Sequence, residues 1–235
     1  MKITLLTGRT FDFSKEFPFE VKVKKSAVAK KLVLRIDEKN HCAVLSVPKY
    51  CSQKQALKFL KDNEDWIVNM LARLPASSDF ANGDEISVFG RTCKICHENK
   101  HKGTCFEGEL LKVGGDESFL HRRVKDFLKK EAVDKLAEMS MKTAEKIGVK
   151  IASVSVKDTK SRWGSCSTRG NINYNWRIVL APKDVINYLI CHEVSHLKHP
   201  NHSTYFWNTV ECLCPSCKDS RRWLKIRGKE LYKYN

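Results

Sequence analysis

The sequence contains little glycine and proline, with 11 Gly and 6 Pro among 235 residues, which excludes collagen-like and low-complexity chains. It also lacks any apolar run near the ~18 residues that a membrane-spanning helix requires, so we expect no insertion into a membrane. The apolar stretch after Met1 is too short for a signal peptide, and an arginine follows it at once. These absences favour a globular protein of the cytoplasm.

Acidic residues are scarce relative to basic ones, because 43 Lys and Arg face 27 Asp and Glu and give a formal net charge of +16. A hydrophobic content of 42% is too high for a disordered basic tail, and the chain is long enough for one large domain or two small ones. The charge suggests nucleic acid or a phosphorylated molecule as a partner, although a solvated basic surface explains it equally well. Basic residues concentrate at 22–35, 122–130 and 218–233.

The ten cysteines are expected to be reduced thiols in the cytoplasm. Two groups of cysteine and histidine have short spacings that can hold an additional zinc ion. The first comprises Cys93, Cys96, His97, His101 and Cys105, and the second comprises Cys212, Cys214 and Cys217. Neither shows the paired CxxC spacing of a strong zinc motif, and free cysteine is also a common core residue. We therefore expect core packing more than metal binding at both groups.

The N-terminal part is predicted to be mostly β. Segments that alternate apolar and polar residues, or are apolar and bounded by turns, predict strands at 31–37, 42–47, 84–89, 92–96 and 105–113. Ser52 and Gln55 form a capping box that opens one helix reaching about Leu74. Because Gly114 and Gly115 supply a turn, we predict a mostly β region with one helix at 1–114 and a second domain at 115–235.

The second domain is predicted to contain a long helix at 117–147, strands at 151–156 and 171–180, a helix at 182–198 and another from about residue 203. The fourth of these elements carries the sequence His192-Glu193-Val194-Ser195-His196. Positions i and i+4 of a helix share one face, so both imidazoles can bind one metal ion. Glu193 lies beside the first of them and can accept a proton from water. The alternative is two histidines on a helix surface with no metal.

A third ligand is expected beyond Pro200, which ends the helix. A chain that turns back there can bring His202 to the same ion, and three protein ligands plus water make an open, catalytic zinc site. His199 is the alternative third ligand. Its spacing directs it away from the face shared by His192 and His196, which favours a supporting or solvated position.

Four segments together resemble the YgjP-like metallopeptidase family, which is related to SprT-like proteins and other small zincins. They are Ser161–Cys166, Asn175–Arg177, His192–Ser203 and Phe206–Trp207, and the resemblance extends over roughly residues 15 to 232. It implies an α+β fold with a minimal zincin-like core beside the N-terminal β region. It also implies that His192, His196 and His202 bind Zn²⁺, or a different divalent metal, and that Glu193 is catalytic.

The resemblance therefore implies a zinc-dependent metallohydrolase, and three substrate classes stay open. A peptide is favoured, and the predicted strand at 171–180 can pair with an extended one. A nucleoside triphosphate such as UTP is the second, since some family members are described as pyrophosphatases. A basic module that associates with nucleic acid is the third. Arg162 and Arg177 can hold a substrate carboxylate or phosphate, or can tie the intervening loop to the strand.

Overall fold

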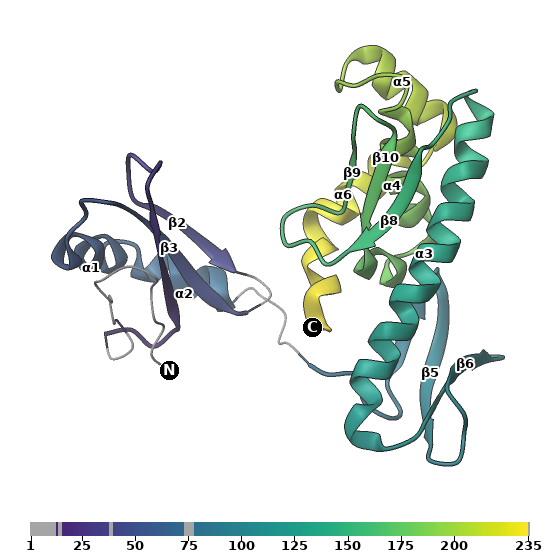
Figure 1. The fold of residues 1–235 in the computed structure, drawn as a ribbon, viewed down its shortest axis with the longest axis horizontal. Helices are drawn as coiled ribbons and strands as arrows, with labels where there is room; N and C mark the ends of the chain where they lie inside the picture. Colours follow the sequence, from purple (N-terminus) through teal and green to yellow (C-terminus); the bar gives the residue numbers. More distant parts are fainter. Residues whose placement is uncertain (1–12, 14–15, 38–39, 73–77, 235) are drawn as a thin grey trace. The chain divides into compact units, whose positions relative to one another are not determined.

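The computed structural model describes residues 13, 16–37, 40–72 and 78–234 (Figure 1). The chain divides into two compact units, Met1–Ser77 and Ser78–Asn235. The expectations about the segment after Met1 and about the end of a helix at Leu74 lie outside the described residues. No helix of the described part is both long and apolar enough to cross a bilayer.

The first unit is a three-stranded sheet with two helices on one face. Strands β1 (Val21–Ser26), β3 (Cys42–Pro48) and β2 (Val33–Asp37) lie in the order β1-β3-β2, with β1 parallel and β2 antiparallel to β3. Helices α1 (Gln53–Lys61) and α2 (Glu64–Ala72) pack on this sheet in a common apolar core. One continuous helix was predicted here. It is interrupted at Asp62 and Asn63, where the Asn63 side-chain amide donates to the Phe59 carbonyl over 2.8 Å.

The second unit begins with a four-stranded sheet in the order β4-β5-β7-β6. Its strands are β4 (Glu85–Val88), β5 (Arg91–Glu98), β6 (Thr104–Glu107) and β7 (Leu110–Gly114). One face of this sheet, including Ile95, Leu111 and Val113, shares a core with the long helix that follows. The boundary between compact units therefore lies at Ser77 and not at Gly114, because this sheet has no separate core of its own.

A single long helix organises the second unit. Helix α3 (Leu120–Lys146) follows the short 3₁₀ helix η1 (Glu117–Phe119) and runs the length of the unit (Figure 1). Its buried stripe recurs at helical spacing through Leu120, Val124, Leu128, Ala132 and Leu136. The four-stranded sheet lies beside its N-terminal half and a second, three-stranded sheet beside its C-terminal half (Figure 1).

The three-stranded sheet corrects one prediction. Its strands β8 (Ser153–Lys157), β10 (Asn171–Asn175) and β9 (Gly164–Cys166) lie in the order β8-β10-β9. The chain leaves the sheet after Asn175, whose side chain accepts from the Arg177 amide over 3.0 Å and opens the 3₁₀ helix η2 (Trp176–Leu180). β10 pairs with a strand on each side, so the proposed pairing of 171–180 with a substrate is wrong.

The remaining helices close the unit. Helix α4 (Lys183–Ser195) is buried along most of its length, and it ends three residues before the predicted Lys198 because the following turn tightens to i→i−3 hydrogen bonds. Helices α5 (Thr204–Leu213) and α6 (Cys217–Arg227) then pack against α4, and η3 (Gly228–Lys233) leads to the C-terminal residues. The predicted α+β architecture is confirmed.

Candidate metal centre

Three histidine rings converge where α4 ends and α5 begins. His192 lies in the last turn of α4, His196 is its C-cap residue, and His202 immediately precedes Ser203, the N-cap of α5. The ligand nitrogens of the three rings all lie within 4.8 Å of one another. The structure thus brings together the three residues that the sequence predicted as ligands.

The position of His202 follows from local structure. Ser203 caps α5 by accepting from the Phe206 amide over 3.4 Å, which fixes the chain direction at residue 202. The Nε2 atoms of His202 and His192 lie 3.2 Å apart. Two histidine nitrogens bound to one tetrahedral zinc ion, each at 2.0–2.1 Å, are about 3.3 Å apart. The donor set and this spacing therefore fit a zinc ion.

Aromatic side chains form the walls behind these rings. The Phe206 ring is fully buried, and its centroid lies 4.6–5.0 Å from the centroids of all three imidazoles. The Trp207 ring stacks on the His202 ring with the two centroids 5.8 Å apart. The Arg221 guanidinium lies over the Trp207 ring, 4.6 Å from its centroid. The rings are thus held from one side while His202 stays exposed to solvent.

A hydrogen-bonding group lies beside Nδ1 of each of the two helix histidines. Nδ1 of His196 lies 3.3 Å from the backbone carbonyl of His199, a contact that places the proton on Nδ1 and leaves Nε2 for a metal. Nδ1 of His192 lies 3.5 Å from the Tyr188 hydroxyl, one turn earlier on α4. His199 therefore contributes its backbone, and its own ring stacks on Tyr205 away from the three-histidine group.

Burial keeps these imidazoles neutral. Desolvation, with smaller contributions from the neighbouring His196 and His202, lowers the pKa of His192 to about 3. Desolvation is also the main cause of the lowered pKa of His196. A metal ion binds the neutral imidazole, so both residues are in the binding form without losing a proton at neutral pH.

Glu193 lies under the edge strand of the three-stranded sheet. Its side chain is 4% exposed, and burial raises its pKa to about 8 against the lowering effect of the Arg162 charge. The carboxylate packs directly on the backbone of Gly164 in β9, since a Cβ atom at residue 164 would lie 2.7 Å from Cδ of Glu193.

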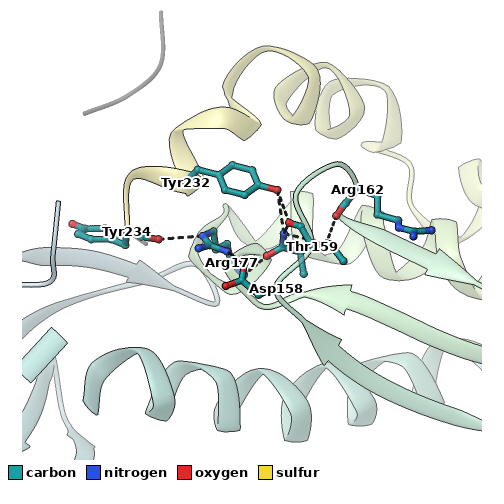
Figure 2. Close-up of polar contacts among 7 residues, drawn as sticks. Asp158, Thr159, Arg162, Arg177, Tyr232 and Tyr234 are labelled. Atoms are coloured by element: carbon teal, nitrogen blue, oxygen red, sulfur yellow. Dashed lines mark hydrogen bonds and ion pairs between the residues drawn. The ribbon is translucent and has the colours of Figure 1, made fainter. Parts of the chain in front are cut away.

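The two arginine candidates have different surroundings. Arg177 is fully buried, its Nη1 lies 2.6 Å from an Asp158 carboxylate oxygen, and its Nε donates to the Tyr234 carbonyl over 3.1 Å (Figure 2). It ties η2 to the C-terminal residues and offers no surface to a substrate, which corrects its assignment as a substrate-binding candidate. Arg162 is exposed, and its side chain points away from this cluster (Figure 2).

Three residues near the centre were not recognised from the sequence. Tyr188 and Arg221 reach His192 and Trp207 as described above, and the Arg221 charge contributes to the lowered pKa of His192. Cys166 lies on β9 two residues after Gly164, and burial together with the Glu193 charge raises its thiol pKa to about 11. The helical spacing from Tyr188 to His192 is a usable local signal, whereas nothing local connects Arg221 to residues about thirty positions earlier.

The cysteine groups do not assemble as their spacing suggested. Cys93 faces the core and is 4% exposed, whereas Cys96 lies on the opposite face of β5. Cys214 and Cys217 are buried in an apolar cluster with Phe206, whereas Cys212 is exposed. Within the described residues, these three thiols do not form a group with ligand-like separations.

Basic residues are only partly gathered at this centre. The six basic residues of 22–35 belong to the first compact unit, and those of 122–130 lie on α3. Arg162 and Arg221 are the two guanidinium groups whose charge is felt by Glu193 or by His192. Within the second unit, the basic residues of 122–130 therefore lie on a different helix from His192.

Comparisons with known proteins identify the family of this chain. A family model described as the YgjP-like metallopeptidase domain matches residues 30–227. One solved structure, the metallopeptidase zymogen abylysin of Pyrococcus abyssi, is 24% identical over 40% of this chain and 95% of that chain, with a TM-score of 0.34, a level that carries no inference about activity. No curated protein matches significantly. Because the family model covers most of the sequence, including all three histidines, the chain belongs to the YgjP-like metallopeptidase family.

Proposed function

We propose that the protein is a zinc-dependent metallopeptidase in which His192, His196 and His202 hold the ion. The observation that carries the proposal is the convergence of three imidazole nitrogens within 4.8 Å, beside a buried carboxylate. When bound, zinc supplies Lewis-acid polarisation of the scissile carbonyl and makes water more acidic. Three protein ligands leave a coordination position open, as catalytic zinc sites require.

Glu193 is proposed as the general base. Its raised pKa means that the carboxylate, once ionised, is a stronger base than an exposed glutamate, so it can take a proton from the attacking water. The same group can then deliver that proton to the leaving amine. The Gly164 backbone holds the carboxylate from the side opposite α4, which limits the positions it can occupy.

We propose that an extended peptide lies along β9 and not along β10. β9 is one of the two edge strands in the order β8-β10-β9, and its Gly164 touches Glu193. The backbone groups on the outer side of an edge strand can pair with an added strand, which would align a peptide bond beside the carboxylate. Arg162 is exposed next to β9, and in this proposal it contacts a substrate carboxylate or phosphate.

A nucleotide pyrophosphohydrolase is the second candidate. Arg162 and Arg221 favour it, because their charges act on Glu193 and His192 and guanidinium groups can hold a triphosphate by bidentate hydrogen bonds. The metal ion and Glu193 would serve either reaction.

One experiment separates these candidates. Zinc-loaded protein is assayed for cleavage of a denatured protein substrate and for pyrophosphate release from UTP, alongside Glu193→Gln, His202→Ala and the control His199→Ala. We expect peptide cleavage that falls by about 10²–10⁴-fold in Glu193→Gln with bound zinc retained. We expect His202→Ala to lose zinc and His199→Ala to keep both zinc and activity, because only the backbone of residue 199 contacts His196.

The alternative outcomes are distinct. Pyrophosphate release that is lost in Glu193→Gln, without peptide cleavage by the wild type, selects the nucleotide reaction. Peptide cleavage that persists unchanged in Glu193→Gln removes the general-base assignment. Zinc binding that requires His199 and not His202 removes the proposed ligand set.

A further inference from the structure

A second set of metal-ligating side chains lies on the four-stranded sheet. His101, Cys105 and Glu107, called here the His101 cluster, have ligand atoms that all lie within 4.8 Å of one another. Sγ of Cys105 and Nε2 of His101 are 3.4 Å apart. His101 and Cys105 are half-buried, whereas Glu107 is exposed. Only part of the group suggested by the sequence therefore converges, and a glutamate that the sequence did not indicate joins it.

The fold builds this cluster from one strand and one short loop. Cys105 and Glu107 are two residues apart on β6, so their side chains share a face of the sheet. His101 lies in the loop between β5 and β6, which is pinned by the hydrogen bonds His101 N to Glu98 O at 2.9 Å and Gly114 N to Gly103 O at 2.7 Å. The three ligands are thus preorganised by backbone contacts.

Gly114 allows the loop to approach this closely. A Cβ atom at residue 114 would lie 2.6 Å from the carbonyl carbon of His101 and 3.1 Å from the carbonyl oxygen of Gly103. Any side chain at residue 114 would therefore push the loop, and His101 with it, away from β6.

The separations match those of a zinc site. A cysteine sulfur at about 2.3 Å and a histidine nitrogen at about 2.05 Å from one tetrahedral zinc ion are about 3.5 Å apart. The observed Sγ–Nε2 distance of 3.4 Å is close to this value. A thiolate also selects zinc over magnesium and calcium, which prefer oxygen ligands.

The surrounding charges are compatible with a divalent cation. Lys112 lies opposite Cys105 in the β6–β7 register, and its Nζ is 2.9 Å from Oε2 of Glu107 and 3.2 Å from Oε1 of Glu98. Glu98 balances the lysine charge. A Cys105 thiolate and the Glu107 carboxylate, through its other oxygen Oε1, then balance the two charges of zinc.

We propose that the His101 cluster binds a second zinc ion, with water as the fourth ligand and independently of the three-histidine centre. The ion would join the β5–β6 loop to β6 and hold this end of the sheet. The opposite face of the same sheet packs on α3, so this site is separated from the core by the sheet itself. The proposal does not depend on the peptidase or nucleotide reaction.

Cobalt distinguishes the two sites, because a thiolate ligand gives an intense near-ultraviolet charge-transfer band that a three-histidine site does not give. Metal-free full-length protein is titrated with Co²⁺, and bound metal is measured together with the spectrum. We expect two equivalents in the wild type, with the thiolate band associated with one of them. We expect Cys105→Ser to lose this band and one equivalent, and Cys96→Ser, on the same face of the sheet, to keep both.

Two further variants complete the test. We expect Glu107→Gln to bind the second equivalent at least about tenfold more weakly, because it removes a charged metal ligand. Even the loss of a residue that only supports a ligand typically lowers metal affinity by about 10–100-fold. His202→Ala should lose one equivalent while the thiolate band persists, which separates this site from the proposed catalytic one. A single equivalent without a thiolate band in the wild type, or a band that survives Cys105→Ser, would overturn the proposal.

Discussion

The contact between Gly164 and Glu193 offers a sharp test of the proposed base. In a Gly164→Ala variant the new Cβ would lie 2.7 Å from Cδ and 2.8 Å from Cγ of Glu193. Ordinary carbon–carbon contacts are about 3.5–4.0 Å, so the carboxylate must move by about 1 Å. A displacement of that size near the reacting atoms can cost about 10²-fold in rate. We therefore predict a decrease of about 100-fold in kcat.

The same variant should leave the metal in place. None of the three histidines is among the atoms nearest to the new Cβ, so bound zinc should stay at one equivalent at this centre. Overpacking of a buried position costs about 1–3 kcal/mol of the free energy of unfolding. Gly228→Ala is the matched control, because the three atoms nearest its Cβ belong to the Trp163 ring, at 3.2–3.4 Å, and its activity should stay near that of the wild type.

The assays are steady-state kinetics on the substrate that the zinc-loaded wild type turns over, zinc analysis and urea unfolding. A Glu193→Ala background provides a thermodynamic check, since the stability cost of Gly164→Ala should largely disappear when the opposing side chain is removed. The reasoning is refuted if folded Gly164→Ala retains wild-type kcat, or if its stability loss persists in the Glu193→Ala background.

Two other predictions concern buried charge. Arg177→Met should lower the free energy of unfolding by about 3 kcal/mol, while the folded protein keeps its kcat. This value is near the lower end for a broken buried ion pair because Asp158 is partly exposed. Urea unfolding and steady-state kinetics measure the two quantities, and a fall in kcat without a loss of stability would contradict a structural role. In metal-free protein, burial raises the pKa of Glu193 from 4.5 to about 8, so ionisation favours the unfolded state as pH rises between these values. The contribution of Glu193 to the free energy of unfolding should fall by up to about 5 kcal/mol over that pH range. Urea titrations with a chelator at several pH values should show a smaller decrease of the free energy of unfolding with pH in Glu193→Gln than in the wild type. An equal decrease in both proteins would count against this prediction.

Local patterns in the sequence predict the part of the centre that depends on helix geometry. His192 and His196 are four residues apart, so their convergence follows from one helical turn, and Pro200 indicates where the chain must change direction. Ser203 is a recognisable N-cap just after His202, and α5 begins where it predicts.

Predictions that depend on three-dimensional neighbours were less successful. The alternation from Ile172 to Leu180 resembles one strand, yet residues 176–179 are buried all round in η2, and the capping side chain of Asn175 was the only local sign of the change. Arg162 and Arg177 have the same chemistry in sequence. Only the fold shows that Arg177 forms an ion pair with Asp158 and donates a hydrogen bond to the Tyr234 carbonyl, although both residues are distant from it in sequence.

Anomalous diffraction at the zinc absorption edge, on crystals of the zinc-loaded protein, tests the central claim most directly. The account predicts a peak bonded to the Nε2 atoms of His192, His196 and His202 at about 2.0–2.1 Å. The absence of a peak between these three rings, or a peak there that involves His199 in place of His202, would contradict it.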